Sequence, residues 1–216
     1  LAAGRAPNVG GLGLETAGVE YDRKTGIRVN RCLRTANPDV YAAGDVCFIH
    51  RFTHLAEQSG GMAARNALLP VWWERFPDRL ISWSLHTDPE VARVGLTERQ
   101  AGENGMEVET FHVALSEVER AIVDGDENGF VRVHVRAPTG RILGAAVAGS
   151  GAGELAGFFA QAIARRTGIC RLGCVTLPSA TYTAAVRLVA DKYRAAHVRH
   201  TCREFADSWL RLRRNA

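Results

Sequence analysis

The chain is organised around Thr35-Ala36-Asn37-Pro38-Asp39-Val40-Tyr41-Ala42-Ala43-Gly44-Asp45-Val46. Its apolar residues 40–43 predict a short buried strand, and Pro38 marks the turn that precedes the strand. Gly44 then allows the backbone to turn sharply, so that Asp45 presents its carboxylate just beyond the strand end. Open α/β sheets bind their ligands outside the carboxyl ends of their strands. Asp45 is therefore the first candidate binding residue.

A helix is predicted shortly after this turn. Phe52-Thr53-His54-Leu55-Ala56 opens the helix, and residues 55–69 continue with helical spacing. The first amides of a helix have no partner within the helix, so they can hold an electronegative atom of a ligand. The start of this helix is the second candidate binding element.

Together, the two motifs TxxPxxYAAGDV and FTHLA resemble the second flavin-contacting segment of the pyridine nucleotide-disulfide oxidoreductases. This family includes flavoproteins of the dihydrolipoamide dehydrogenase and mercuric reductase type. The resemblance implies that Asp45, placed by Gly44, hydrogen-bonds the ribityl chain of FAD. It also implies a structural role for His54 at the flavin edge. The residues that would face the pyrimidine edge of the isoalloxazine ring are Thr53, His54, Leu55 and Ala56.

Glycines near the start of the chain belong to a different motif. Gly4-Arg5-x-Pro7-Asn8 looks like the family's GRxPN signature, whose glycine backbone lies near the nicotinamide nucleotide. Residues 10–13, GGLG, do not predict a phosphate-binding loop, because no strand precedes them and the full GxGxxG spacing is absent. The resemblance thus implies the cofactors FAD and NAD(P)H, with Gly4 as a further cofactor-binding residue.

Bulk properties restrict the class of protein. The 216 residues, 46% of them apolar, can build one large or two small domains with a proper core. No apolar run is long enough to span a bilayer, and five irregularly spaced cysteines favour a reducing, cytoplasmic environment. The net charge is +4, but the basic residues form no stripe with aromatic partners, so nucleic acid is not an expected partner. Because the chain starts at Leu1 in mid-motif, we expect it to be a fragment.

Four segments are predicted. Residues 1–69 form the C-terminal segment of the NAD(P)- and FAD-binding domains, and residues 70–84 form a linker that carries Trp72 and Trp73. Residues 85–198 form an α+β dimerisation domain, whose start at 85–98 resembles the family's FTxPExAxVGxTE motif. Residues 199–216 form a basic amphipathic helix, which is more consistent with capping a protein surface than with lying on a membrane.

Alternation and turn residues predict an antiparallel sheet with flanking helices in the dimerisation domain. Thr97 is the predicted N-cap of a helix over 98–104, and residues 124–129 are predicted to form a hairpin-type turn. The predicted strands are 91–96, 107–115, 130–135 and 142–147, and the further helices are 154–167, 181–195 and 199–214.

The family's acid–base dyad, HPTxxE or a tyrosine variant, has no counterpart here. In the segment 177–187, Ser179 stands at the histidine or tyrosine position and Ala184 stands at the glutamate position. Serine is not a base at neutral pH and alanine does not titrate, so we assign no catalytic residue. The loss argues against an ordinary dithiol reductase and leaves flavin chemistry that needs no thiol base.

The redox-active CxxxxC of the family is also absent from these residues. Cys170 and Cys174 are spaced CxxxC in a predicted loop. A soft-metal or zinc site that combines them with His197, His200 and Cys202 has suitable ligand types but loose spacing, so ordinary buried thiols are favoured and no metal site is assigned.

The sequence predicts part of an FAD-dependent oxidoreductase that passes hydride from NAD(P)H through FAD to an acceptor. The acceptor would be a disulfide, a metal ion or a quinone. The alternative is a non-catalytic dimerisation module or a degenerate remnant of such an enzyme. The resemblance also implies a homodimer through residues 85–198, and we expect the isolated fragment to be inactive.

Overall fold

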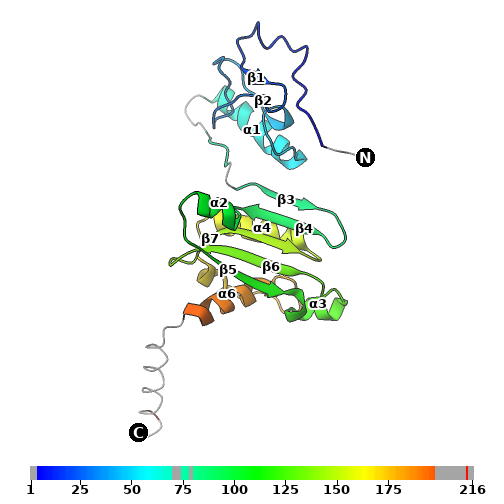
Figure 1. Ribbon diagram of the computed structural model, residues 1–216, viewed down its shortest axis with the longest axis vertical. Coiled ribbons are helices and arrows are strands. Elements are labelled where there is room, and N and C mark those ends of the chain that lie inside the picture. Colours follow the sequence, from blue (N-terminus) through cyan, green and yellow to red (C-terminus); the bar gives the residue numbers. More distant parts are fainter. Residues whose placement is uncertain (1–3, 70–73, 78–79, 198–212, 214–216) are drawn as a thin grey trace. The chain divides into compact units, whose positions relative to one another are not determined.

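The computed structural model describes residues 4–69, 74–77, 80–197 and 213. The chain divides into two compact units, residues 1–78 and 79–216, and each is described by itself (Figure 1). No helix in the described part of the chain combines the length and apolar character that crossing a membrane requires.

The N-terminal unit contains little regular structure besides one long helix. Strand β1 (Tyr21–Asp22) pairs with β2 (Gly26–Ile27) across a tight turn. The Asp22 carboxylate closes this turn by accepting hydrogen bonds of 2.8 Å from the amides of Lys24 and Thr25. The 3-10 helix η1 (Gly44–Val46) and the helix α1 (Thr53–Leu68) follow, so the predicted helix is confirmed.

The predicted strand over 40–43 is wrong. Tyr41 forms only an isolated antiparallel bridge with Arg34, although Ala42 is buried as expected. A strand needs a neighbour along its length, and here only residues 33–35 pair with the run, through hydrogen bonds of 3.0 and 3.1 Å. The apolar run therefore predicts burial correctly, but its prediction of a strand is wrong.

The C-terminal unit is built on a five-stranded antiparallel sheet in the order β3-β4-β7-β6-β5. This sheet confirms the predicted α+β class and the predicted antiparallel arrangement. The strands are β3 (Ser82–Leu85), β4 (Val91–Gly95), β5 (Val108–Ala114), β6 (Phe130–Arg136) and β7 (Arg141–Ala148).

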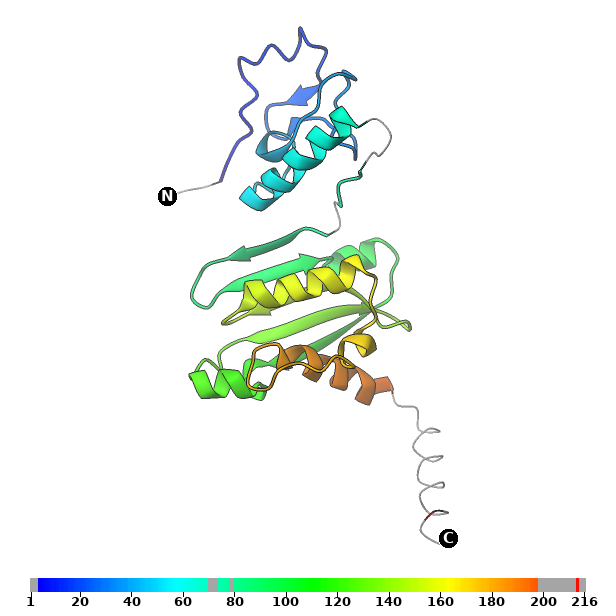
Figure 2. The same ribbon diagram turned by 180° about the vertical axis from the view of Figure 1, so that it is seen from behind.

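Two helices cover one face of this sheet, as Figure 2 shows. Helix α4 (Ala152–Ala164) packs on β3, β4 and β7, and α6 (Ala184–His197) packs on β5 and β6. The core between the helices and the sheet contains the fully buried Phe159 and the β-branched residues of the central strands. Alternation along the strands places these apolar side chains on one face.

The predicted cap of the helix α2 (Glu98–Glu103) is confirmed. The Thr97 hydroxyl accepts a hydrogen bond of 3.1 Å from the amide of Gln100, and the Gln100 side chain accepts one of 3.0 Å from the amide of Thr97. This reciprocal arrangement is a capping box.

Several boundaries differ from the prediction. The predicted linker over 70–84 overlaps a strand, because residues 82–84 already pair with β4. Residues 124–129 do not join two strands directly, because the connection from β5 to β6 contains the 3-10 helix η2 (Leu115–Glu117) and α3 (Glu119–Asp124). Gly125, at φ +70°, ends α3.

The connection after α4 also differs. The predicted loop around Cys170 contains a short helix, α5 (Ile169–Leu172), and α6 begins at Ala184 rather than at residue 181. Trp72, Trp73 and the predicted C-terminal helix, apart from the helical Arg213, lie outside the described residues.

Candidate functional site

Gly44 is held closely against helix α1. It is buried with φ +75°, and an added Cβ would lie 3.0 Å from the Cβ of Ala56. The Gly44 amide donates a 3.0 Å hydrogen bond to the Ser59 hydroxyl, which itself donates to the Ala56 carbonyl. Because both the positive φ and the close approach exclude a side chain, glycine is required at this turn.

Asp45 follows this turn and keeps its carboxylate accessible. Its side chain is 41% exposed and lies 3.3 Å from Nη1 of Arg5. Arg5 also donates to the Arg51 carbonyl at 3.1 Å, and Arg51 donates back to the Arg5 carbonyl at 2.8 Å. The structure therefore places the Gly4-Arg5 motif beside Asp45 and beside Arg51, which directly precedes Phe52.

The sequence analysis did not assign roles to Arg5 and Arg51. Arg5 is part of the GRxPN motif, so its signal was available, but its partner lies 40 residues away. Gly4, with φ +103°, precedes it in an exposed position. Only glycine adopts this conformation readily, which fits a backbone that a ligand could approach.

The start of helix α1 has no polar side chain at its N-cap. The N-cap is Phe52, whose carbonyl accepts hydrogen bonds of 3.1 Å from the amides of Leu55 and Ala56. Thr53 and His54 occupy the first two helical positions, where an α-helix offers its amides no internal partner. The positive end of the helix dipole thus faces outward at the predicted position.

The four predicted flavin-facing side chains differ in exposure. Thr53 and His54 are exposed, Ala56 is half-buried and Leu55 is buried, where it anchors the first turn. The His54 ring stacks on Phe52 with centroids 5.5 Å apart.

Ser179 and Ala184, the predicted dyad positions, line a pocket of about 90 Å³ in the C-terminal unit. Ser179 is exposed in the turn before α6, and Ala184 is the first residue of α6. The charged residues at this pocket are Glu119 from α3 and Arg187 from α6, neither of which the sequence analysis identified. The dyad positions themselves carry no group that can exchange a proton at neutral pH.

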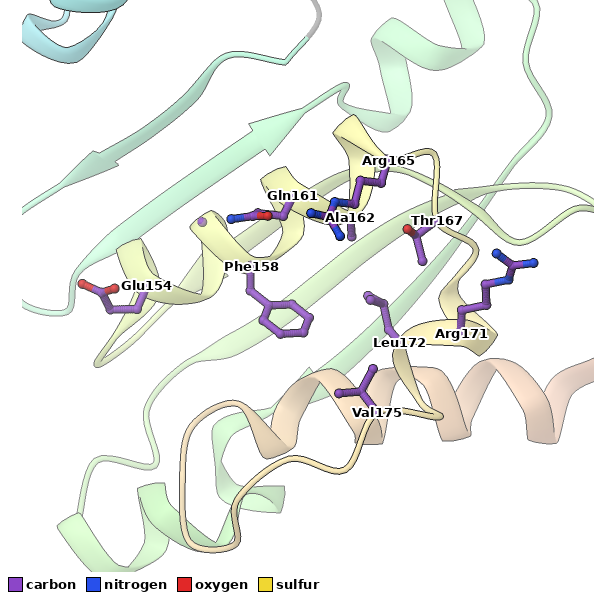
Figure 3. Close-up of a pocket in the computed structure, with 10 residues that line it drawn as sticks. Glu154, Phe158, Gln161, Ala162, Arg165, Thr167, Arg171, Leu172 and Val175 are labelled. Carbon is purple, nitrogen blue, oxygen red and sulfur yellow. The ribbon is translucent and has the colours of Figure 1, made fainter.

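A second pocket, of about 600 Å³, lies along α4, α5 and the segment after α5 (Figure 3). Phe158, Leu172 and Val175 make its apolar part, and it was not predicted from the sequence. Its polar lining consists of Glu154, Gln161, Arg165, Thr167 and Arg171.

The metal ligands considered from the sequence lie only partly among the described residues, and Cys170 and Cys174 are exposed rather than buried as expected. His197 lies 2.9 Å from the Glu109 carboxylate and 2.9 Å from the Tyr193 carbonyl. His200 and Cys202 lie outside the described residues. Within the described ranges, no group of three or more His, Cys, Asp or Glu side chains could hold a metal ion.

Comparisons with known proteins identify the family of this chain. Residues 1–68 match the family model of the pyridine nucleotide-disulphide oxidoreductases, and residues 81–190 match the model of their dimerisation domain. The chain therefore belongs to the pyridine nucleotide-disulphide oxidoreductase family, which confirms the resemblance found in the sequence.

Three relatives show how similar this chain is to known proteins and how much of their length it covers. The chain is 37% identical to mercuric reductase of Staphylococcus aureus, over 72% of this chain and 28% of that protein. It is 34% identical to mercuric reductase of Streptomyces lividans, over 94% of this chain and 42% of that protein. The crystal structure of LpdA from Mycobacterium tuberculosis matches 86% of this chain and 40% of its own, with 27% identity and a TM-score of 0.79. The chain thus spans less than half the length of these relatives.

Proposed function

We propose that this chain supplies the FAD-facing turn and helix, and the dimerisation domain, of an FAD-dependent NAD(P)H oxidoreductase. The observation that carries the proposal is the position of the Gly44–Asp45 turn against α1, which places an accessible carboxylate beside a helix start without a polar cap. When bound, FAD would accept hydride from NAD(P)H and pass the electrons to an acceptor.

The residues present fit FAD. The Asp45 carboxylate is a strong acceptor for a ribityl hydroxyl, and Arg5 holds it in place from one side. The start of α1 at Thr53, with its helix dipole, would stabilise negative charge on the edge of a reduced flavin. Gly4 would leave its backbone accessible to a nicotinamide nucleotide.

The acceptor is proposed as a disulfide, a metal ion or a quinone. Serine and alanine at positions 179 and 184 favour an acceptor that needs no thiol base. The same observation supports the second candidate function, a non-catalytic dimerisation module. In either case we propose a homodimer through residues 85–198 and a cytoplasmic location, the latter supported by the free thiols among the described cysteines.

Replacement of Asp45 by alanine, made in the whole protein that contains this chain, tests this function. A hydrogen bond to a charged group contributes about 1.5–3 kcal/mol, so Asp45→Ala should weaken FAD binding by about 10- to 100-fold. The measurement is FAD release followed by flavin fluorescence. Asp39→Ala, an exposed carboxylate in the same segment, is the matched control and should leave FAD binding unchanged.

Two results would contradict the proposal. Equal FAD affinity in the Asp45 and Asp39 variants would exclude the assigned contact. A wild-type protein that binds no FAD and oxidises no NAD(P)H, yet forms a stable dimer, would instead support the non-catalytic module.

A further inference from the structure

Helices α4 and α6 pack on one face of the sheet of the C-terminal unit, as Figure 2 shows. Val131 and Val133 of β6 are fully buried in the core under these helices. Side chains alternate along a strand, so Phe130, Arg132 and His134 point to the opposite face. We call that opposite face the open face, and the proposed function makes no use of it.

One row of side chains crosses the open face through every strand of the sheet. Directly opposed residues of an antiparallel pair lie on the same face, and the register supplies one residue from each strand. From β3 to β5 the row consists of Trp83, Arg93, Ala146, Arg132 and His112. Neighbouring strands lie about 4.8 Å apart, so the backbones of Arg93 and Arg132 are separated by roughly 10 Å, with the small Ala146 between them. The row therefore has ring side chains at its two ends and arginines within it.

The rows on either side of this one differ in character. One of them is apolar and consists of Leu85, Val91, Ala148, Phe130 and Ala114. The other consists of Gly95, Gly144, His134 and Thr110. The strand positions in these three rows hold no acidic residue, so positive charge and apolar surface lie side by side on the open face.

The two arginines of the central row have neutral partners. The Arg132 guanidinium lies 5.1 Å from the centroid of the Phe130 ring, and the His112 ring stacks on that same ring with centroids 5.5 Å apart. Arg93 donates a 2.9 Å hydrogen bond to the side-chain oxygen of Gln100. Within the described ranges, no carboxylate forms an ion pair with either arginine. Both positive charges are therefore available to an anion.

One carboxylate reaches the edge of the open face. Glu98 accepts a 3.3 Å hydrogen bond from the Thr110 hydroxyl, which lies 2.9 Å from Nδ1 of His134. Burial lowers the pKa of His134, Glu98 opposes this shift, and the positive charges of Arg132 and Arg93 add to it. The fields of the two arginines thus meet at the centre of the sheet, against a single negative charge.

The chemistry of the open face selects one class of partner. Arginines bind phosphate groups, and aromatic rings, histidine rings and guanidinium planes stack on nucleic-acid bases. A single strand offers its phosphates and the faces of its bases together, whereas a double helix keeps the base faces inside its stack. A bilayer fits less well, because side chains would have to enter it by about 5–10 Å. Apart from the exposed Leu85, the apolar row is half-buried.

We propose that the open face binds single-stranded nucleic acid, with Arg93 and Arg132 on the phosphates and with His112 and Trp83 as stacking surfaces for the bases. The sequence analysis did not expect this partner, because these residues are scattered along the chain and only the register of the sheet joins them in one row. The inference does not rest on the proposed function, since the turn at Asp45 belongs to the other unit.

Fluorescence anisotropy with the whole protein that contains this chain tests the proposal. The probe is fluorescein-labelled oligo(dT) of about 12 nucleotides, within the range of known single-strand sites. Saturating FAD and NADH keep the probe away from nucleotide sites. We expect binding that weakens as salt rises, with a slope of about −0.7 in log K against log salt for each phosphate contact. A duplex of the same length should bind at least about tenfold more weakly.

Substitutions separate the phosphate contacts from stacking. Arg132→Gln should weaken binding by about tenfold and make the salt slope shallower by about 0.7, whereas Arg132→Lys should keep the slope. His112→Ala should weaken binding at least about fivefold and leave the slope unchanged, because stacking carries no charge. Arg187→Gln is the matched control, since it removes an exposed arginine from α6 on the covered side, and it should change neither quantity.

Three results would overturn the proposal. Equal affinity for the single strand and the duplex would mean attraction by net charge alone. Wild-type affinity in the folded Arg132→Gln protein, checked by circular dichroism, would exclude the assigned contact. Capture of phosphatidylglycerol vesicles through Arg132, without binding of the oligonucleotide, would assign the open face to a membrane surface instead.

Discussion

The N-terminal and C-terminal units bury different kinds of group. The C-terminal unit has one continuous apolar core, which extends from Ala92 in β4 to Tyr193 in α6. The corresponding cluster among the described residues of the N-terminal unit is smaller, and its buried members are Val9, Leu14, Val19, Ile27 and Ala42. Since burial of apolar area is the main stabilising term in folding, the C-terminal unit has the larger source of stability.

Side-chain hydrogen bonds to the backbone fix the irregular segments of the N-terminal unit. Asn66 of α1 is buried and donates to the carbonyls of Cys32 and Glu74, at 2.9 and 3.0 Å, while accepting from the amide of Glu74 at 2.9 Å. Arg51 connects the backbones of Arg5 and Lys24 in the same way. The unit that carries the proposed flavin contacts is therefore shaped by polar contacts between loops, and the other unit by packing.

Truncation of Phe159 should give the largest effect on stability. Its side chain is fully buried between α4 and the sheet, so Phe159→Ala should lower the free energy of unfolding by about 3–5 kcal/mol. Guanidinium denaturation followed by circular dichroism measures this change. Ile122→Ala, at a residue 52% exposed, should change it by less than about 0.5 kcal/mol. A small loss at Phe159 would contradict the view that one apolar core holds the C-terminal unit.

Removal of the Asn66 side chain should have a smaller and local effect. Asn66→Ala leaves partly buried backbone groups of Cys32 and Glu74 without this partner, at a cost of about 1–3 kcal/mol. Hydrogen exchange should show faster opening in residues 4–77 and no change in residues 80–197. Gln58→Ala, exposed on the same helix, is the control. Equal acceleration in both units would show that they unfold together.

The same contrast explains what could be predicted from the sequence. Alternation in β4 and the Thr97 cap are local signals, and the structure confirms them. The short elements β3, α3 and α5 were missed, because four to six residues hold too little periodic pattern to separate them from loops. Gly44 was identified because its turn is encoded locally.

Contacts between distant residues left no such signal. The Arg5–Asp45 pair spans 40 residues, and the contact of Arg194 with Cys174 spans 20. Neither follows from spacing along one helix or strand, since each depends on how two elements are brought together. Such arginine contacts are therefore harder to predict from the sequence than local turns and caps.

The smallest predicted effect concerns His197 at the end of α6. The hydrogen bond to the Tyr193 carbonyl and the nearby Glu109 carboxylate raise the pKa of His197, although desolvation opposes the shift. A neutral imidazole has one N–H group, so only the protonated ring can donate to both partners. Its stabilisation is thus fully present below the ordinary imidazole pKa of about 6.5 and is lost as pH rises through the raised value.

We therefore expect the wild-type protein to lose up to about 1 kcal/mol of stability relative to His197→Gln as pH rises through this window, since exposed ion pairs contribute little. The measurement is the difference in unfolding free energy between the two proteins on each side of the window. Glu109→Gln should reduce the same pH dependence by removing one of the two acceptors of the charged ring. A difference that does not change with pH would mean that packing of the ring on Tyr193, with centroids 4.1 Å apart, holds the end of α6 without help from its charge.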